Sequence, residues 1–116
     1  MDESALGTDE VSAVDAVALS AAGEAYLLDV REQFEWTAGH ATAAHLLPMS
    51  VIESRAHEIP ADQRVLVVCH SGQRSGRVTE ALRRAGYDAA NVLGGMLAWR
   101  DAGGDIVSDG PGEPRV

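Results

Sequence analysis

The residues best suited to chemistry form one short run, Cys69-His70-Ser71-Gly72-Gln73-Arg74, which is followed by Ser75. A cysteine reacts as its thiolate, and a thiolate is favoured by nearby positive charge and by the free N–H groups at the start of a helix. Arg74 supplies the charge, and a helix that begins near Ser75 would supply the N–H groups. Gly72 allows the chain to curl so that successive N–H groups point at one anion. We therefore expect a cradle for a thiolate or a persulfide, which requires neither a metal nor an organic cofactor.

Cys69 has a second interpretation, because most free cysteines are small buried residues without a chemical role. It is the sole cysteine of the chain. An internal disulfide and a resolving thiol are therefore both excluded, and a reactive Cys69 needs an acceptor from outside. The chain also lacks lysine, which excludes chemistry that uses a lysine Schiff base or a lysine general base.

The strongest predicted strand ends at this cysteine. Arg64 to Cys69 is an apolar, valine-rich run typical of a strand buried on both faces. Apolar residues then recur at helical spacing up to Gly86, at positions 78, 81, 82 and 85. Ligands of open parallel sheets bind beyond the carboxyl ends of the strands, which is where Cys69 falls.

The remaining chain alternates in the same way. The patterns predict helices that begin at Ser12 and Ser50, the latter from the capping box Ser50-Val51-Ile52-Glu53, and further elements at residues 26–30 (strand), 32–38 (helix), 44–47 (strand), 91–93 (strand) and 96–102 (helix). This order predicts an α/β fold with a mostly parallel sheet of about five strands and helices on both faces.

Length and charge indicate the organisation of the chain. With 116 residues, 46% of them hydrophobic, we expect one domain at residues 11–104, a flexible acidic leader at 1–10 and a flexible Gly/Pro-rich tail at 105–116. The net charge of −9 argues against nucleic acid and anionic membranes as partners. No apolar run approaches the roughly 18 residues that span a bilayer, and the first residues are acidic, so we expect a cytoplasmic protein.

Four segments, in the expected order, resemble the rhodanese-like domain family from about Val11 to Trp99. They are Leu28-Asp29-Val30-Arg31 with Glu35, Gly39-His40 with Pro48, the run Val67 to Ser75, and Leu82, Gly86, Val92-Leu93, Gly94-Gly95 and Trp99. One departure is Ala41-Thr42-Ala43, where the family usually has an apolar-Pro-Gly triplet.

This resemblance implies a single-domain sulfurtransferase with Cys69 as its catalytic residue. It would move sulfane sulfur from thiosulfate or a persulfide donor, through a Cys69 persulfide, to cyanide or a thiol. The thiol acceptor can belong to a partner protein. The alternative is a non-catalytic carrier or interaction module of the same fold that acts on a partner enzyme. Phosphatases of related fold place five residues between cysteine and arginine, whereas only residues 70–73 separate Cys69 from Arg74, which favours sulfur over phosphate.

The other loop residues also have two interpretations each. Arg74 is expected to bind the sulfonate of thiosulfate as a planar fork, or else to neutralise a nearby carboxylate. His70, beside the nucleophile, is a candidate general base, but we favour a side chain that faces solvent, since a preset thiolate needs no base. Ser71 and Gln73 are expected at the entrance, and Ser75 caps the helix or bonds to sulfur.

Outside the loop, Asp29 and Arg31 reach the same edge of the sheet. We expect an ion pair that locks the strand end, with Arg31 as an alternative anion contact. A metal site is not expected, because the single cysteine and the histidines at positions 40, 45, 57 and 70 lack zinc-ligand spacing. Trp36 and Trp99 are expected to cover the core.

Overall fold

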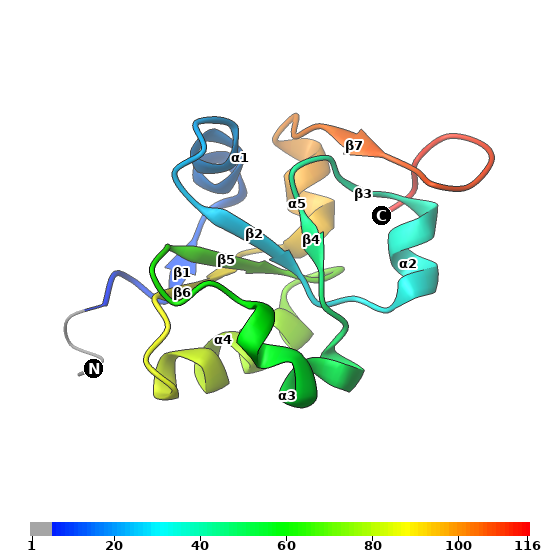
Figure 1. Ribbon diagram of the computed structural model, residues 1–116. Helices are drawn as coiled ribbons and strands as arrows, with labels where there is room; N and C mark the ends of the chain where they lie inside the picture. Colours follow the sequence, from blue (N-terminus) through cyan, green and yellow to red (C-terminus); the bar gives the residue numbers. More distant parts are fainter. Residues whose placement is uncertain (1–5) are drawn as a thin grey trace.

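The computed structural model describes residues 6–116, which fold around a five-stranded parallel sheet (Figure 1). The strand order is β1-β6-β5-β2-β4, and every neighbouring pair is parallel. The strands are β1 (Glu10–Val11), β2 (Tyr26–Asp29), β4 (His45–Leu46), β5 (Val65–Val68) and β6 (Ala89–Val92). The predicted α/β class and strand number are therefore confirmed.

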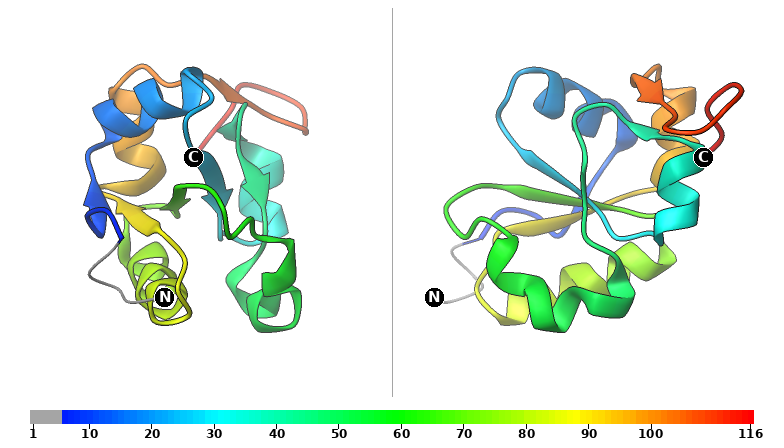
Figure 2. Two further views of the ribbon diagram at one scale, coloured as in Figure 1. Left: turned by 60° about the vertical axis from the view of Figure 1, so that its left-hand side comes forward. Right: turned by 45° about the vertical axis from the view of Figure 1, so that its right-hand side comes forward.

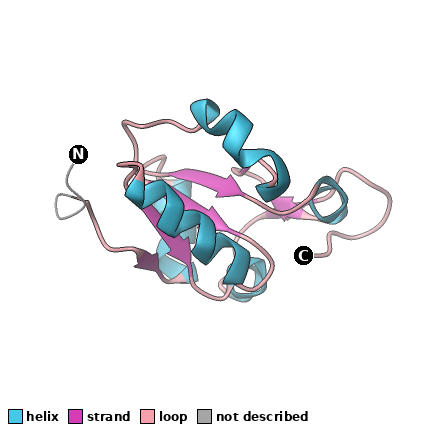
Figure 3. Cartoon of the chain, turned by 90° about the horizontal axis from the view of Figure 1, so that it is seen from below, coloured by secondary structure: helices cyan, strands magenta, loops and turns pink. Residues whose placement is uncertain are grey.

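Helices cover both faces of this sheet. They are α1 (Ala13–Ala21), α2 (Gln33–Ala38), α3 (Ile52–Arg55), α4 (Gln73–Arg84) and α5 (Gly95–Asp101). Helices α1 and α5 lie on one face, while α3 and α4 lie on the other, as the view from below in Figure 3 shows. Within residues 6–116, no helix has both the length and the apolar content required to cross a membrane.

Strand β5 lies at the centre of the sheet and divides the core in two. All four of its residues are buried, and their side chains alternate between the faces. Leu66 and Val68 join the core formed with α1 and α5, whereas Val65 and Val67 join the core beneath α4. The same alternation places Cys69 in the second core, on the α4 side.

Two helix starts test the predictions from capping patterns. Ser12 caps α1 as predicted, because its Oγ accepts a hydrogen bond from Asp15 N at 3.1 Å. The prediction that one helix begins at Ser50 and ends before Pro60 is wrong: residues Met49–Val51 and Ala56–Glu58 are 3-10 turns, η2 and η3, on either side of the short α3. Ser50 lies inside η2, where its hydroxyl donates to Glu32 Oε1 at 2.8 Å, and the residue before α3 is Val51, which provides no side-chain cap.

The ends of the chain contain paired backbone within segments that we expected to be flexible. Beyond residue 104, β7 (Ile106–Val107) pairs antiparallel with β3 (His40–Ala41). Farther along, Arg115 N donates to Ala38 O at 2.8 Å, and Figure 2 shows this segment beside α2. At the other end β1 begins at Glu10; residues 1–5 of the expected leader lie outside the described residues.

Candidate active site

Cys69 directly follows β5, and its sulfur is surrounded by hydrogen-bond donors. The Sγ atom accepts bonds from Gly72 N at 3.2 Å, Ser75 N at 3.4 Å and Ser75 Oγ at 3.2 Å. The whole residue is 1% exposed. A buried sulfur with this many donors is arranged to hold negative charge.

The curl of the loop depends on Gly72. Its φ of +108° lies in the region that side chains disfavour, and it is the residue immediately before α4. Helix α4 begins at Gln73, two residues earlier than the predicted start near Ser75. The first turn of the helix therefore wraps around the sulfur, and its N–H groups and positive dipole end face Cys69.

A second helix holds the loop from the opposite side. Met96 N and Leu97 N, in the first turn of α5, donate to Cys69 O at 2.8 Å and His70 O at 3.3 Å. Gly95 has a φ of +59°, and a Cβ there would lie 2.5 Å from both of these carbonyl oxygens. Only glycine permits this close approach. From the sequence, the Gly94-Gly95 pair predicted a turn but not this contact with the loop.

These contacts set the acidity of the thiol. Burial is the largest single influence and raises the pKa of Cys69, but the hydrogen bonds oppose it: the Ser75 hydroxyl and the backbone N–H groups of Ser75, Gly72 and Ser71 together bring the pKa below its ordinary value. The donors thus favour the thiolate despite the apolar surroundings.

The guanidinium of Arg74 binds a carboxylate on α2. Its Nη1 and Nη2 atoms donate to Glu35 Oε1 and Oε2 at 2.8 and 2.9 Å, which makes the pair bidentate. The Arg74 hydrogen bond holds the pKa of Glu35 at about 2, against an opposing effect of burial. Arg74 was expected either to bind a sulfonate or to neutralise a nearby carboxylate, and the structure contains the carboxylate partner.

The remaining predicted residues divide between the surface and the interior. His70, Ser71 and Gln73 are exposed, whereas Ser75 is fully buried. Arg31 is 1% exposed and forms the expected ion pair with Asp29 at 2.8 Å, while its Nη2 also donates to Gly39 O at 2.7 Å. These bonds leave Arg31 locked at the end of β2 and not at the surface.

Asn91 on β6 belongs to the site although the sequence analysis did not select it. Its Oδ1 accepts a bond from Ser75 Oγ at 2.6 Å, and its Nδ2 donates to Gly72 O at 3.0 Å. Asn91 thus joins two of the residues that donate to Cys69 Sγ. The available signal was a polar residue inside a short, otherwise apolar strand.

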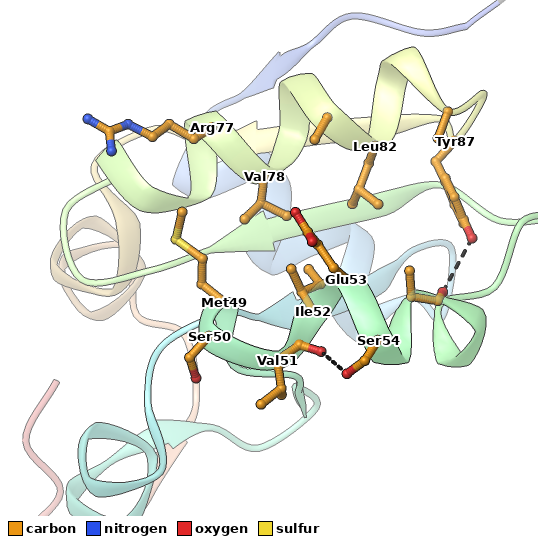
Figure 4. Close-up of a pocket in the computed structure, with 13 residues that line it drawn as sticks. Met49, Ser50, Val51, Ile52, Glu53, Ser54, Arg77, Val78, Leu82 and Tyr87 are labelled. Atoms are coloured by element: carbon orange, nitrogen blue, oxygen red, sulfur yellow. Dashed lines mark hydrogen bonds between the residues drawn. The ribbon is translucent and has the colours of Figure 1, made fainter.

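A groove on the same side of the sheet is separate from the sulfur. It lies between α3 and α4, has a volume of about 640 Å³ and is lined mainly by apolar side chains, among them Met49, Ile52, Val78 and Leu82 (Figure 4). Cys69 does not line it. Arg77 at one end lies one helical turn beyond Arg74.

Comparisons with known proteins identify the family of the chain. Residues 12–102 match the family model described as "Rhodanese-like domain". A protein named "Sulfurtransferase" from Allochromatium vinosum is 39% identical over 83 residues, which cover 71% of this chain and 78% of that protein. The crystal structure of a rhodanese-related protein from Thermoplasma volcanium has a TM-score of 0.80 and 27% identity, and covers 86% of this chain and 98% of that one.

The chain belongs to the rhodanese-like domain family, and its relatives named as sulfurtransferases support sulfur transfer in general. The match spans only part of some curated relatives. It covers 61% of the length of one and 19% of the probable adenylyltransferase/sulfurtransferase MoeZ of Mycobacterium tuberculosis, which is 37% identical over 76 residues, or 63% of this chain.

Proposed function

We propose that this protein is a sulfurtransferase in which Cys69 carries sulfane sulfur as a persulfide. The observation that carries the proposal is the set of three donated hydrogen bonds at Cys69 Sγ, from Gly72 N and from the backbone and hydroxyl of Ser75. The two backbone donors are fixed, and such donors stabilise an anion without reorganisation during the reaction.

The reaction has two steps of the ping-pong type. In the first, the Cys69 thiolate attacks the outer sulfur of thiosulfate, a new S–S bond forms, and sulfite leaves with the electron pair of the bond that breaks. The outer sulfur of the resulting persulfide carries the negative charge. In the second step, cyanide or a thiolate attacks that outer sulfur, and the electron pair of the broken S–S bond returns to Cys69. The donors at Gly72 and Ser75 stabilise the thiolate that leaves.

Arg74 is proposed to favour anionic donors. Its guanidinium is 37% exposed on the side chain and is bonded to Glu35. A sulfonate that displaces both Glu35 oxygens would keep the fork geometry, because carboxylate and sulfonate present similar paired oxygens. The four-residue spacing between Cys69 and Arg74 suits a single sulfur better than a phosphate.

The alternative function is a carrier that loads or unloads only when docked on a partner enzyme. The 1% exposure of Cys69 favours it, because a largely covered sulfur is hard for a free acceptor to reach, and a docked partner enzyme would have to uncover it. The MoeZ relative has a match over only 19% of its length, which fits a domain that works beside another enzyme. In either case we propose a cytoplasmic protein with small sulfur-containing anions or persulfides as donors and thiols as acceptors.

The test is sulfur uptake and release by the purified chain. We expect incubation with thiosulfate to add the mass of one sulfur atom to Cys69, and subsequent cyanide to remove it as thiocyanate over many turnovers. Cys69→Ser should show neither, with an unchanged circular dichroism spectrum. Uptake from a persulfide donor without turnover of thiosulfate and cyanide would favour the carrier, and no uptake from any donor would refute sulfur transfer.

A further inference from the structure

The Ser75 hydroxyl lies between two acceptors. Its Oγ is 3.2 Å from Cys69 Sγ and 2.6 Å from Asn91 Oδ1. A serine hydroxyl has a single proton, so it donates one full hydrogen bond at a time. Ser75 is 0% exposed, and a buried hydroxyl without an acceptor is costly. The two acceptors therefore compete for one proton.

The orientation of the Asn91 amide is fixed by its other bond. Its Nδ2 donates to Gly72 O at 3.0 Å, and since a carbonyl oxygen only accepts, the amide nitrogen faces Gly72 and Oδ1 faces Ser75. Asn91 pairs with Val67 of β5 and Glu10 of β1, so its backbone is held between two strands. Its acceptor is therefore a fixed feature of the sheet.

The charge on sulfur decides which acceptor is better. When Cys69 is a free thiolate, the charge lies on Sγ, and a charge-assisted bond from Ser75 is favoured. When Cys69 carries sulfur, the charge moves to the outer atom and Sγ becomes a neutral, weak acceptor. The Ser75 hydroxyl then rotates about its Cβ–Oγ bond and donates to Asn91 Oδ1.

We propose, on the basis of the sulfur-transfer function above, that Asn91 is a positioning residue that accepts the Ser75 hydroxyl bond while Cys69 carries sulfur and competes with the thiolate for that bond when Cys69 is free. No covalent bond changes in this exchange, and the proton stays on Ser75. Asn91 thereby stabilises the loaded state relative to the free thiolate.

The proposal makes an unusual prediction for the thiol, because removing a nearby polar group should make Cys69 more acidic. Without Asn91, the Ser75 hydroxyl has only Sγ to bond. Gly72 O loses one donor but retains Gly76 N at 3.2 Å, so the loop keeps an anchor. A neutral replacement also leaves in place the charged and titratable groups nearby, which are Arg74 and Arg77 on α4, Glu35 on α2, Asp29 at the end of β2 with Arg31 after it, Glu10 beside Asn91 on β1, and His70 in the loop.

The first measurement is the pH dependence of Cys69 alkylation by iodoacetamide. We expect Asn91→Ala to lower the midpoint by about half a pH unit or more, the equivalent of one modest hydrogen bond. In a Ser75→Ala background the same change should leave the midpoint where Ser75→Ala puts it. Thr79→Val is the matched control, because Thr79 Oγ1 donates to Ser75 O at 2.7 Å on the same helix and has no part in the competition. Its midpoint should equal that of the wild type.

The second measurement is the fraction of protein that holds sulfur at equilibrium with thiosulfate and sulfite, read by intact mass. Asn91→Ala should reduce the ratio of loaded to free protein by about threefold or more. Asn91→Leu, which fills the space without polar atoms, should repeat both results if the alanine variant folds poorly.

Several results would overturn the proposal. An unchanged or raised alkylation midpoint in both Asn91 variants, an equal shift in the Ser75→Ala background, or failure of both variants to fold would give Asn91 a purely structural role. If the wild type takes up no sulfur, the proposed function fails and the part of the inference about the loaded state fails with it, while alkylation still decides the competition for the Ser75 hydroxyl.

Discussion

Arg74 and Glu35 bind each other through two parallel hydrogen bonds, of 2.8 and 2.9 Å, that join the active-site helix α4 to α2. Glu35 Oε1 also accepts a bond from Glu32 N at 3.1 Å within the capping box of α2. The charge that follows the cysteine loop is thus tied to a helix from a distant part of the sequence. An anionic donor that binds Arg74, as proposed, would have to compete with this pair.

The first prediction concerns the choice among donors. We expect Arg74→Ala to raise KM for thiosulfate by about tenfold, because a charge-assisted bond to a sulfonate contributes on the order of 1.4 kcal/mol or more, and to change KM for an uncharged organic persulfide donor much less. Steady-state kinetics with both donors measure this difference. Arg77→Ala, on an exposed position one turn farther along α4, is the charge-matched control. Equal losses for both donors in Arg74→Ala would remove Arg74 from donor binding.

The second prediction concerns stability in acid. The pKa of Glu35 is lowered from its ordinary value of 4.5 to about 2 by Arg74, so its contribution to folding is complete above pH 4.5 and is lost as the pH falls toward 2. Because Arg74 is partly exposed, the contribution should not exceed about 1 kcal/mol. Urea unfolding should show Glu35→Gln less stable than the wild type at pH 7 and nearly equal to it near pH 2. A constant difference between these pH values would show that the charge of Glu35 is not what stabilises the pair.

The sequence alone was sufficient for the parts of the fold that depend on local patterns. The valine-rich run of β5, the helical spacing of α4 and the Ser12 cap each correspond to an element in the structure. The prediction from the capping box at Ser50 failed because Ser50 lies inside the 3-10 turn η2, and the residue before α3 is Val51, which has no capping side chain. A local pattern also could not reveal that the Ser50 hydroxyl donates to Glu32, a residue from another segment.

The site divides in the same way. Cys69 and Ser75 are close in sequence, so their relation follows from a loop that curls into a helix. The contributions of Asn91 and Gly95 come from β6 and α5, and they arise only when the sheet places those elements against the loop. The partner of Arg74 is also remote in the sequence, and the sequence alone could not indicate which carboxylate the guanidinium would bind.

The third prediction isolates the close contact between α5 and the loop. Gly95→Ala should reduce sulfur transfer by at least tenfold, because the new Cβ would lie 2.5 Å from Cys69 O and His70 O and must displace the loop. Gly23→Ala is the matched control: Gly23 also has a positive φ, of +70°, but a Cβ there would have nothing within 4 Å. Both variants should lose about 1 kcal/mol from backbone strain. Denaturant unfolding measures that shared cost, and equal activities in the two variants would contradict a role for Gly95 at the loop.

The last prediction concerns the buried ion pair that ends β2. Asp29 and Arg31 are 0% and 1% exposed, and Asp29 Oδ1 also accepts a bond from Arg31 N at 3.0 Å. Asp29→Asn should cost about 3 to 5 kcal/mol, because it leaves the Arg31 charge buried without a counter-ion. The exposed pair of Arg55 and Glu58 offers the matched comparison, and Glu58→Gln should change stability little. Urea unfolding of the two variants at pH 7 measures both effects. A small loss for Asp29→Asn would mean that Gly39 O and the remaining amide oxygen are enough to hold Arg31, and that the charge of Asp29 is not needed to lock the strand end beside the site.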